Sequence, residues 1–159
     1  PAGHRAVTEY RDDVAVVVLG DFNDDPYDKS ITIHAQGCRD KGDVQRAKSA
    51  KFYNFAWEYM TQTVADHNGK KRLLNGTLYF GSDASVFDQI MVSRGLLTGK
   101  SGLRVVDGSA RIEAYPKAVS HRVGEGPIRF GLPYGEAAKN VNLEGYSDHF
   151  PVSILIEAV

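Results

Sequence analysis

The chain has 159 residues, of which 42% are hydrophobic and 25% are charged, and its formal net charge is −1 at pH 7. This length is typical of one domain, and the near-neutral charge excludes the strong positive field of a general nucleic-acid binder. The single cysteine, Cys38, excludes an internal disulfide and leaves the compartment undetermined, and no stretch is long and apolar enough to span a membrane.

The first predicted element is a buried strand that ends at an acidic motif. Residues 14–19 read Val-Ala-Val-Val-Val-Leu, a run without polar side chains that is typical of a buried β-strand. Gly20 ends the run, and Asp21 and Asn23 follow it with their side chains on the same side of an extended chain. A carboxylate and an amide at a strand end suit a divalent cation together with a phosphate oxygen or a water.

Two other interpretations of this motif were compared with the first. The spacing Asp-x-Asn-x-Asp also begins the calcium-binding loop of helix–loop–helix proteins. Here, however, Pro26 stands where that loop requires Gly, and Thr32 stands where it requires Glu. Asp24 and Asp25 can also form an ordinary turn and helix cap, and the five residues of the motif alone leave that interpretation open.

The next part of the chain is predicted to contain two helices and a loop. A short helix is expected over residues 29–36, capped by Asp28 and ended by Gly37. Residues 39–51 are polar and predict a loop. Residues 52–64 place apolar side chains at helical spacing, so we expect a helix whose aromatic side chains pack in the core and do not stack on bases.

The remainder of the chain is predicted to be mainly β-structure. The predicted strands in this part span residues 77–80, 86–93, 103–107, 111–115 and 150–157. The strands at 103–107 and 111–115 are predicted to form a hairpin. Residues 122–145 are rich in Gly and Pro and predict a long loop. This loop directly precedes a second acidic motif, which is a natural position for a segment that faces a substrate.

Two acidic residues lie on predicted apolar strand faces. Asp88 shares a face with Ile90, and Asp148 shares a face with Phe150 at the start of the last strand. A carboxylate on an apolar face is costly unless it is paired or bound to a metal. Each residue therefore marks a candidate site, with a buried structural hydrogen bond as the alternative. His149 follows Asp148, and both can reach one site only where the backbone twists.

These motifs resemble those of the endonuclease/exonuclease/phosphatase superfamily, which includes pancreatic-type deoxyribonucleases, abasic-site endonucleases, sphingomyelinases and inositol polyphosphate phosphatases. Three motifs match in order: Gly-Asp-Phe-Asn at 20–23, the strand motif Phe-Asp-x-Ile-x-Val-Ser at 87–93, and Ser-Asp-His at 147–149. The resemblance implies an α+β fold, with a mixed sheet that forms half of a two-sheet β-sandwich and has flanking helices. It does not separate nucleases from phosphatases.

The resemblance also implies a role for each motif residue. Asp21 would orient or deprotonate the attacking water and could also hold metal, and Asn23 would help to hold the phosphate. Asp148 would be a metal ligand, and His149 would contact the scissile phosphate or act as an acid or base. Asp88 would hydrogen-bond His149 and fix its tautomer. The cofactor implied is Mg²⁺, with Mn²⁺ or Ca²⁺ as alternatives.

The same resemblance implies that part of the domain lies outside this chain. In the family, a metal-binding Glu and a substrate-binding Asn come from the N-terminal half of the domain, and the match here begins only at the strand before Gly20. We therefore expect residues 1–159 to be the C-terminal part of one catalytic domain, inactive when isolated, with the N-terminal half as its partner. A homodimer is also expected through an exposed apolar sheet face. The predicted members of this face are Val16, Val18, Ile90, Val92, Val152, Ile154 and Ile156.

The expected function of the parent protein is metal-dependent hydrolysis of phosphodiester bonds, with nucleic acid as the substrate and endonuclease-like activity. A phosphomonoesterase or a phospholipid phosphodiesterase of the same superfamily is the alternative enzyme. A non-catalytic fragment that only assembles or binds is the alternative from a different class of protein. Assays with plasmid DNA, a sphingolipid and an inositol phosphate distinguish these alternatives.

Overall fold

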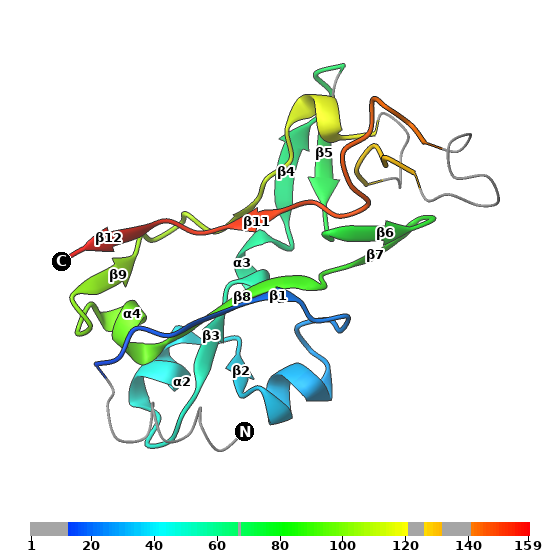
Figure 1. Cartoon of the computed structure of the whole chain (residues 1–159). Helices are drawn as coiled ribbons and strands as arrows, with labels where there is room; N and C mark the ends of the chain where they lie inside the picture. The colour runs from blue at the N-terminus through cyan, green and yellow to red at the C-terminus, as the bar shows by residue number, and fades with distance from the viewer. Residues whose placement is uncertain (1–12, 67, 121–125, 132–140) are drawn as a thin grey trace.

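The structure of the protein is a computed structural model that describes residues 13–66, 68–120, 126–131 and 141–159. It is a mixed α+β fold, with one four-stranded sheet, four two-stranded sheets and short helices (Figure 1). The predicted fold class is therefore confirmed. In the part of the chain described here, no helix has both the length and the apolar character needed to cross a membrane.

The main sheet carries the motif-bearing strand ends. Its strands in spatial order are β1 (Val17–Asp21), β8 (Asp88–Ser93), β3 (Phe52–Asn54) and β2 (Gly37–Cys38). The pairs β1–β8 and β8–β3 are antiparallel, whereas β2–β3 is parallel. β8 is central, and its residues 89–93 are all buried. β1 lies at an edge of the sheet, where Leu19 is 67% exposed.

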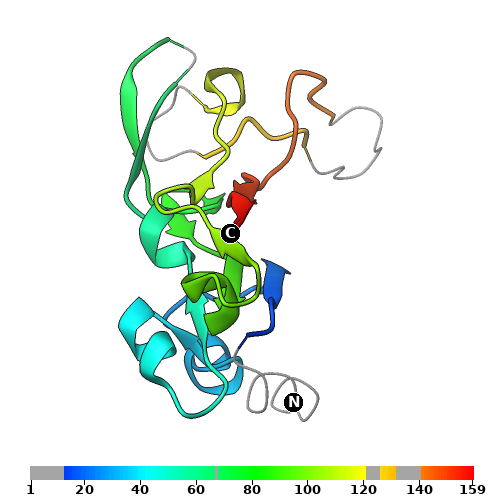
Figure 2. The ribbon, with the colours of Figure 1, turned by 90° about the vertical axis from the view of Figure 1, so that its left-hand side faces the viewer.

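The smaller sheets are antiparallel pairs. They are β4 (Gln62–Ala65) with β5 (Lys71–Leu74), β6 (Leu78–Phe80) with β7 (Asp83–Ser85), β9 (Leu103–Val105) with β12 (Ile156–Ala158), and β10 (Arg111–Ile112) with β11 (Val152–Ser153). The β4–β5 hairpin projects away from the main sheet in both views of the ribbon (Figures 1 and 2). The two pairs that involve β11 and β12 connect the C-terminal segment to the middle of the chain.

The helices are short and lie between the strands. They are η1 (Ser30–His34, a π-helix), α2 (Lys41–Arg46), α3 (Ala56–Tyr59), α4 (Arg94–Thr98) and η2 (Pro116–Ala118, a 3₁₀-helix). Asp40 caps α2, because its carboxylate accepts the backbone N–H of Asp43 at 3.0 Å. The helix predicted over residues 29–36 is represented by η1, and Asp28 does not cap it.

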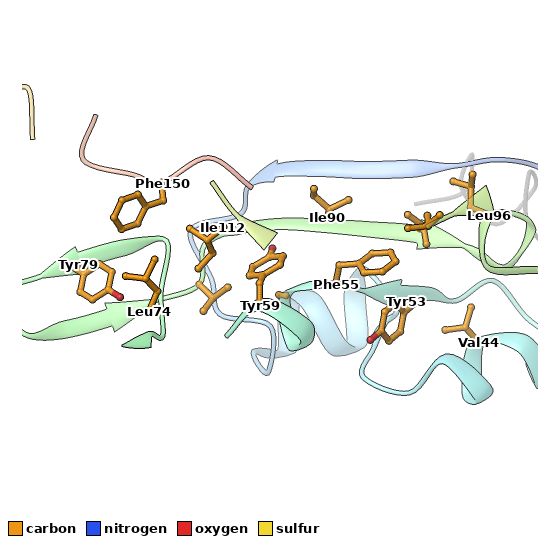
Figure 3. Close-up of a cluster of buried hydrophobic side chains, with 14 of the residues drawn as sticks. Val44, Tyr53, Phe55, Tyr59, Leu74, Tyr79, Ile90, Leu96, Ile112 and Phe150 are labelled. Atoms are coloured by element: carbon orange, nitrogen blue, oxygen red, sulfur yellow. The ribbon is translucent and has the colours of Figure 1, made fainter. Parts of the chain in front are cut away.

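The hydrophobic core lies on both faces of the main sheet. Ile90 and Val92 of β8 belong to the larger cluster, which also includes Phe55, Tyr59 and Phe150 (Figure 3). The neighbouring β8 residue Met91 packs in a smaller cluster with Ile31 and Phe52. This division follows from the alternation of side chains along a strand. β8 is thus packed from both sides, which fixes the position of Asp88 at its first residue.

Several sequence-based predictions of local structure are wrong. Residues 52–64 form β3, α3 and β4 instead of one helix, because Phe52 packs in the smaller cluster while Tyr53 packs in the larger one. The predicted loop 39–51 contains α2. The hairpin predicted over 103–115 is also absent, because β9 pairs with β12 and β10 pairs with β11. The last predicted strand is divided into β11 and β12.

The apolar face that was expected to be exposed is mostly covered by the chain itself. Ile90 and Val92 are buried, and most of the other predicted members are partly buried. Ile156 is the one of the seven that is classed as exposed. The sheet face predicted to drive a homodimer is therefore not an exposed apolar surface, and the prediction of that surface is wrong.

Candidate active site

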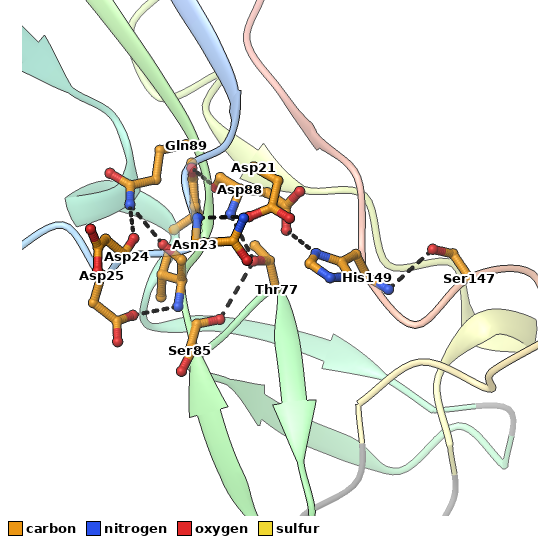
Figure 4. Close-up of polar contacts among 12 residues, drawn as sticks. Asp21, Asn23, Asp24, Asp25, Thr77, Ser85, Asp88, Gln89, Ser147 and His149 are labelled. Atoms are coloured by element: carbon orange, nitrogen blue, oxygen red, sulfur yellow. Dashed lines mark hydrogen bonds and ion pairs between the residues drawn. The ribbon is translucent and has the colours of Figure 1, made fainter. Parts of the chain in front are cut away.

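The centre of the candidate site is a contact between Asp88 and His149. The Nδ1 atom of His149 lies 2.7 Å from Oδ2 of Asp88, and the two side chains are 24% and 20% exposed (Figure 4). When Asp88 is ionised, its carboxylate can only accept hydrogen bonds, and the contact then requires the proton on Nδ1 of His149. The ring is thereby oriented, and its Nε2 atom remains for another partner.

Backbone contacts bring these two residues together from distant parts of the sequence. The N–H of Phe150 donates to the carbonyl of Thr77 at 2.8 Å, and Leu78 forms an isolated antiparallel bridge with His149. The N–H of His149 donates to the hydroxyl of Ser147 at 3.1 Å, which forms a tight turn before the strand. The second motif is therefore placed beside the start of β6 and not by direct pairing with the main sheet.

Asp21 lies beside this pair because of the strand register. In the antiparallel β1–β8 pair, Asp21 stands directly opposite Asp88. Directly opposed residues place their side chains on the same face of the sheet, where two like charges destabilise the pairing. Two opposed carboxylates lower the stability of the fold, so stability does not explain why they are there. The arrangement concentrates carboxylate oxygens next to the imidazole of His149.

Asn23 occupies an unusual backbone conformation in the same cluster. Its φ angle is 53°, in the left-handed region that Asn tolerates better than most residues. Its N–H donates to Oδ1 of Asp21 at 2.9 Å, which closes a local turn. The structure therefore brings four of the five sequence-predicted site residues together: Asp21, Asn23, Asp88 and His149 (Figure 4).

A buried amide network holds the loop that carries Asp21 and Asn23. Gln89 is fully buried, and its Nε2 donates to the carbonyl oxygens of Asp24 at 2.6 Å and Val86 at 3.0 Å. Its Oε1 accepts a hydrogen bond from Nδ2 of Asn54 at 2.6 Å. Because β8 is the central strand, these contacts fix the loop to the most buried part of the sheet.

The two acidic residues after the motif have structural partners. Oδ2 of Asp24 accepts from the hydroxyl of Ser30 at 2.6 Å, and Oδ1 of Asp25 accepts from the N–H of Val86 at 2.6 Å. Oδ2 of Asp25 accepts from Tyr27, and this hydrogen bond raises the pKa of the Tyr27 hydroxyl. The interpretation of Asp24 and Asp25 as turn residues therefore agrees with their contacts.

The remaining predicted site residue, Asp148, makes no hydrogen bond or ion pair within the part of the chain that the structure describes. It is partly buried and directly precedes His149. Within the described ranges, no group of three or more His, Cys, Asp or Glu side chains is arranged to hold a metal ion. The carboxylate oxygens of Asp21 and Asp148 are the kind of hard donor that Mg²⁺ prefers, so the donor chemistry fits such an ion.

Sequence reasoning missed the groups that support Asp88. The hydroxyl of Tyr59 donates to the carbonyl of Asp88 at 2.7 Å, and the hydroxyl of Thr77 accepts its N–H at 3.1 Å. Burial, followed by the nearby charge of Asp88, raises the pKa of Tyr59, so its hydroxyl remains protonated as a donor. The sequence does indicate a hydrogen-bonded role for Gln89, because an amide within an apolar strand needs a partner. Nothing in the sequence indicates the role of Thr77.

Comparison with models of protein families gives one match that spans most of the chain. A family model described as the Endonuclease/Exonuclease/phosphatase family matches residues 5–158. Searches against curated proteins and against solved structures gave no match. The family match covers all three motifs and nearly the whole chain.

Proposed function

The chain belongs to the endonuclease/exonuclease/phosphatase family, whose members hydrolyse phosphoesters, and from that premise we propose that it hydrolyses phosphodiester bonds of a nucleic acid. The observation that carries the proposal is the 2.7 Å contact between Asp88 and His149 with Asp21 opposite Asp88 in the sheet. This arrangement joins an oriented imidazole to a carboxylate that can accept a proton.

In the proposed reaction, the residues of the site divide the work of activating water and binding the phosphate. Asp21 orients the attacking water and accepts its proton as the water oxygen bonds to phosphorus, and the amide of Asn23 donates to a phosphate oxygen. The P–O bond to the departing alcohol breaks, and its oxygen takes up a proton from solvent. His149 presents Nε2 to the phosphate, because its Nδ1 is held by Asp88, and a proton on Nε2 stabilises the negative charge that develops there. A divalent cation, with Asp148 and Asp21 as its proposed ligands, would supply Lewis-acid polarisation of the phosphate when bound.

Exposed aromatic side chains support nucleic acid as the substrate class. Phe80 is 82% exposed at the end of β6, two residues after the residue that bridges His149, and Tyr146 is 69% exposed in the segment that leads to His149. Aromatic side chains beside a phosphate-binding residue can stack on bases, an interaction worth about 1–3 kcal/mol per base. A sphingolipid or an inositol phosphate offers no such ring to stack on.

We also propose that further residues of the parent protein complete this domain. The edge position of β1 supports this: among the described residues β1 has a neighbouring strand on one side only, so its other side can pair with a further strand, and Val17 and Leu19 are exposed on β1. The family resemblance implies that a metal-binding Glu and a substrate-binding Asn belong to the completing part. Poor activity of the isolated chain, restored in the full gene product, is the expected result.

The test compares three substrates with the full gene product that carries this chain. Plasmid DNA should be cleaved in the presence of Mg²⁺, and EDTA should abolish the cleavage. Sphingomyelin and an inositol phosphate should remain intact. If sphingomyelin is hydrolysed and DNA is not, the protein is a phospholipid phosphodiesterase. If the inositol phosphate is hydrolysed and DNA is not, the protein is a phosphomonoesterase. The absence of turnover with all three, with Mn²⁺ and Ca²⁺ also tested, would favour a protein that only assembles or binds.

A further inference from the structure

Thr77 lies at the point where the two catalytic motifs meet. It directly precedes β6, and its side chain is completely buried, with 0% exposure. Its N–H donates to the carbonyl of Ser85 at 2.9 Å, so its own backbone is fixed to the neighbouring strand β7. Thr77 is therefore a rigid position with a hydroxyl that cannot be satisfied by bulk water.

The two remaining polar atoms of Thr77 reach the two motifs separately. Its hydroxyl oxygen accepts the N–H of Asp88 at 3.1 Å, and its carbonyl oxygen accepts the N–H of Phe150 at 2.8 Å. One bond thus fixes the backbone that carries Asp88, and the other fixes the residue after His149. Both bonds are made by the same residue, so Thr77 links the backbone of Asp88 to the backbone of Phe150.

The backbone of Asp88 is held from its other side by Tyr59. The phenol of Tyr59, which is buried in α3, donates to the carbonyl of Asp88 at 2.7 Å. The amide N–H and the carbonyl of Asp88 therefore each bind a buried side-chain hydroxyl. Sheet pairing alone does not supply these contacts, because Asp88 is the first residue of β8.

We propose that Thr77 is a positioning residue for the reaction: its hydroxyl, bound to the N–H of Asp88, sets the Asp88 carboxylate at hydrogen-bonding distance from His149. Thr77 does not touch the reacting atoms and acts through Asp88. The expected fall in kcat rests on the proposed function. The expected loss of the contact between Asp88 and the His149 ring does not, because it can be observed without any substrate.

The experiment replaces Thr77 in two ways, each of which changes one group of the threonine side chain. Thr77→Val keeps the shape of the side chain and removes the hydroxyl, which accepts the N–H of Asp88 and also donates to the carbonyl of Ser85 at 3.5 Å, and Thr77→Ser keeps the hydroxyl and removes a methyl group. Ser93→Ala is the matched control, because the buried hydroxyl of Ser93 also bonds to backbone groups, Val16 N–H and Val14 carbonyl, at the opposite end of β8. Thr77→Ala replaces Thr77→Val if the valine variant does not fold.

Two measurements are made on each variant. The first is the NMR resonance of the Nδ1 proton of ¹⁵N-labelled His149, which is protected from exchange only while the contact with Asp88 persists. The second is kcat and KM for DNA cleavage by the full gene product. We expect Thr77→Val to lose the protected resonance and to lower kcat by about 10- to 100-fold with little change in KM. We expect Thr77→Ser and Ser93→Ala to retain both properties.

The outcomes separate this proposal from the proposed function. If Thr77→Val keeps the protected His149 resonance, Thr77 does not position Asp88, whatever the activity. If the resonance is lost but the wild-type protein cleaves no phosphodiester, the positioning role stands and the proposed function fails. An equal loss of resonance or of kcat in Ser93→Ala would show a general effect of destabilisation and would overturn the proposal.

Discussion

The two segments that carry the candidate active site are held in different ways. The segment with Asp21 and Asn23 is fixed by side chains, chiefly the buried amide of Gln89 and the carboxylate of Asp25. The segment with His149 is fixed mainly by backbone bonds to residues of other elements, such as the bond from Phe150 to Thr77. The first segment is thus held by side-chain contacts with the start of β8 and the residues before it, in addition to the pairing of β1 with β8, and the second is held by backbone contacts with Thr77 and Leu78.

This difference has a consequence for mutations. Substitutions of the buried side chain that supports the first segment, Gln89, should lower the stability of the fold and the activity together, whereas substitutions of the exposed motif residues Asp21 and Asn23 should act chiefly on activity. Substitutions around the second segment should affect activity more selectively, because the backbone bonds survive a change of side chain. The predictions below test the two halves of this comparison, from the largest expected effect to the smallest.

The largest effect is expected for Asp21→Asn. Loss of the carboxylate should lower kcat on the order of 10²-fold or more, because the proposed base is removed. The same change should leave stability unchanged or raise it by up to about 1 kcal/mol, since Asp21 opposes the like charge of Asp88 across β1 and β8. Kinetics and urea unfolding of the same preparation measure both effects. A stability loss with full activity would contradict the proposed role.

The next largest effect is expected for Gln89→Leu. The change removes the bonds to the Asp24 and Val86 carbonyls and leaves buried groups unsatisfied, which costs about 1–3 kcal/mol of unfolding free energy. Gln62→Leu is the matched control, because Gln62 also bonds twice to backbone groups, at Ile112, in the smaller sheets. Both variants should be destabilised in denaturant titrations, but only Gln89→Leu should also lower kcat. Equal kcat losses would remove the link between Gln89 and the motif.

A smaller effect on stability is expected at Asn23, where two substitutions separate backbone strain from chemistry. Asn23→Ala should destabilise the fold by about 1 kcal/mol, because φ is 53°, whereas Asn23→Gly should not. Both should lower kcat if the amide contacts the phosphate. Thermal unfolding and kinetics of the two variants decide the matter, and full activity of Asn23→Gly would show that the amide is not used.

The smallest effect is expected at Glu113, which supports the strand after His149. A hydrogen bond from Ser153, together with Arg111, lowers the pKa of Glu113 below its ordinary value of 4.5. The ionised form therefore stabilises the fold above pH 4.5, and this contribution is lost as the pH falls through the lowered pKa. Glu113→Gln should cost less than about 1 kcal/mol at pH 7. The difference from wild type should shrink below pH 4.5 in unfolding titrations. A difference that is independent of pH would contradict this.

The parts of the site that were predictable from the sequence are those with a local pattern. The apolar runs around Asp21 and Asp88 predicted strands, and the structure has β1 and β8 there. The cost of a carboxylate on an apolar face predicted a partner for Asp88, and His149 lies at 2.7 Å. The catalytic roles of these residues, and of Asp148, remain predictions.

The parts that were not predictable depend on contacts between distant segments. Residues 52–64 fit helical spacing, but their first residues pair with β8, which no local pattern reveals. Likewise, β9 and β10 satisfy a hairpin pattern, yet each pairs with the C-terminal segment. The importance of Thr77 follows only from its bonds to Asp88 and Phe150, which lie on different elements.

The central claim is that Asp88 and His149 act as one unit in phosphodiester hydrolysis. A double-mutant cycle with Asp88→Asn and His149→Gln, read as kcat/KM for DNA cleavage by the full gene product, tests it most directly. Each single variant should lose activity on the order of 10²-fold, and the double variant should be little worse than His149→Gln alone. Losses that multiply in the double variant, or a fully active Asp88→Asn, would contradict the claim.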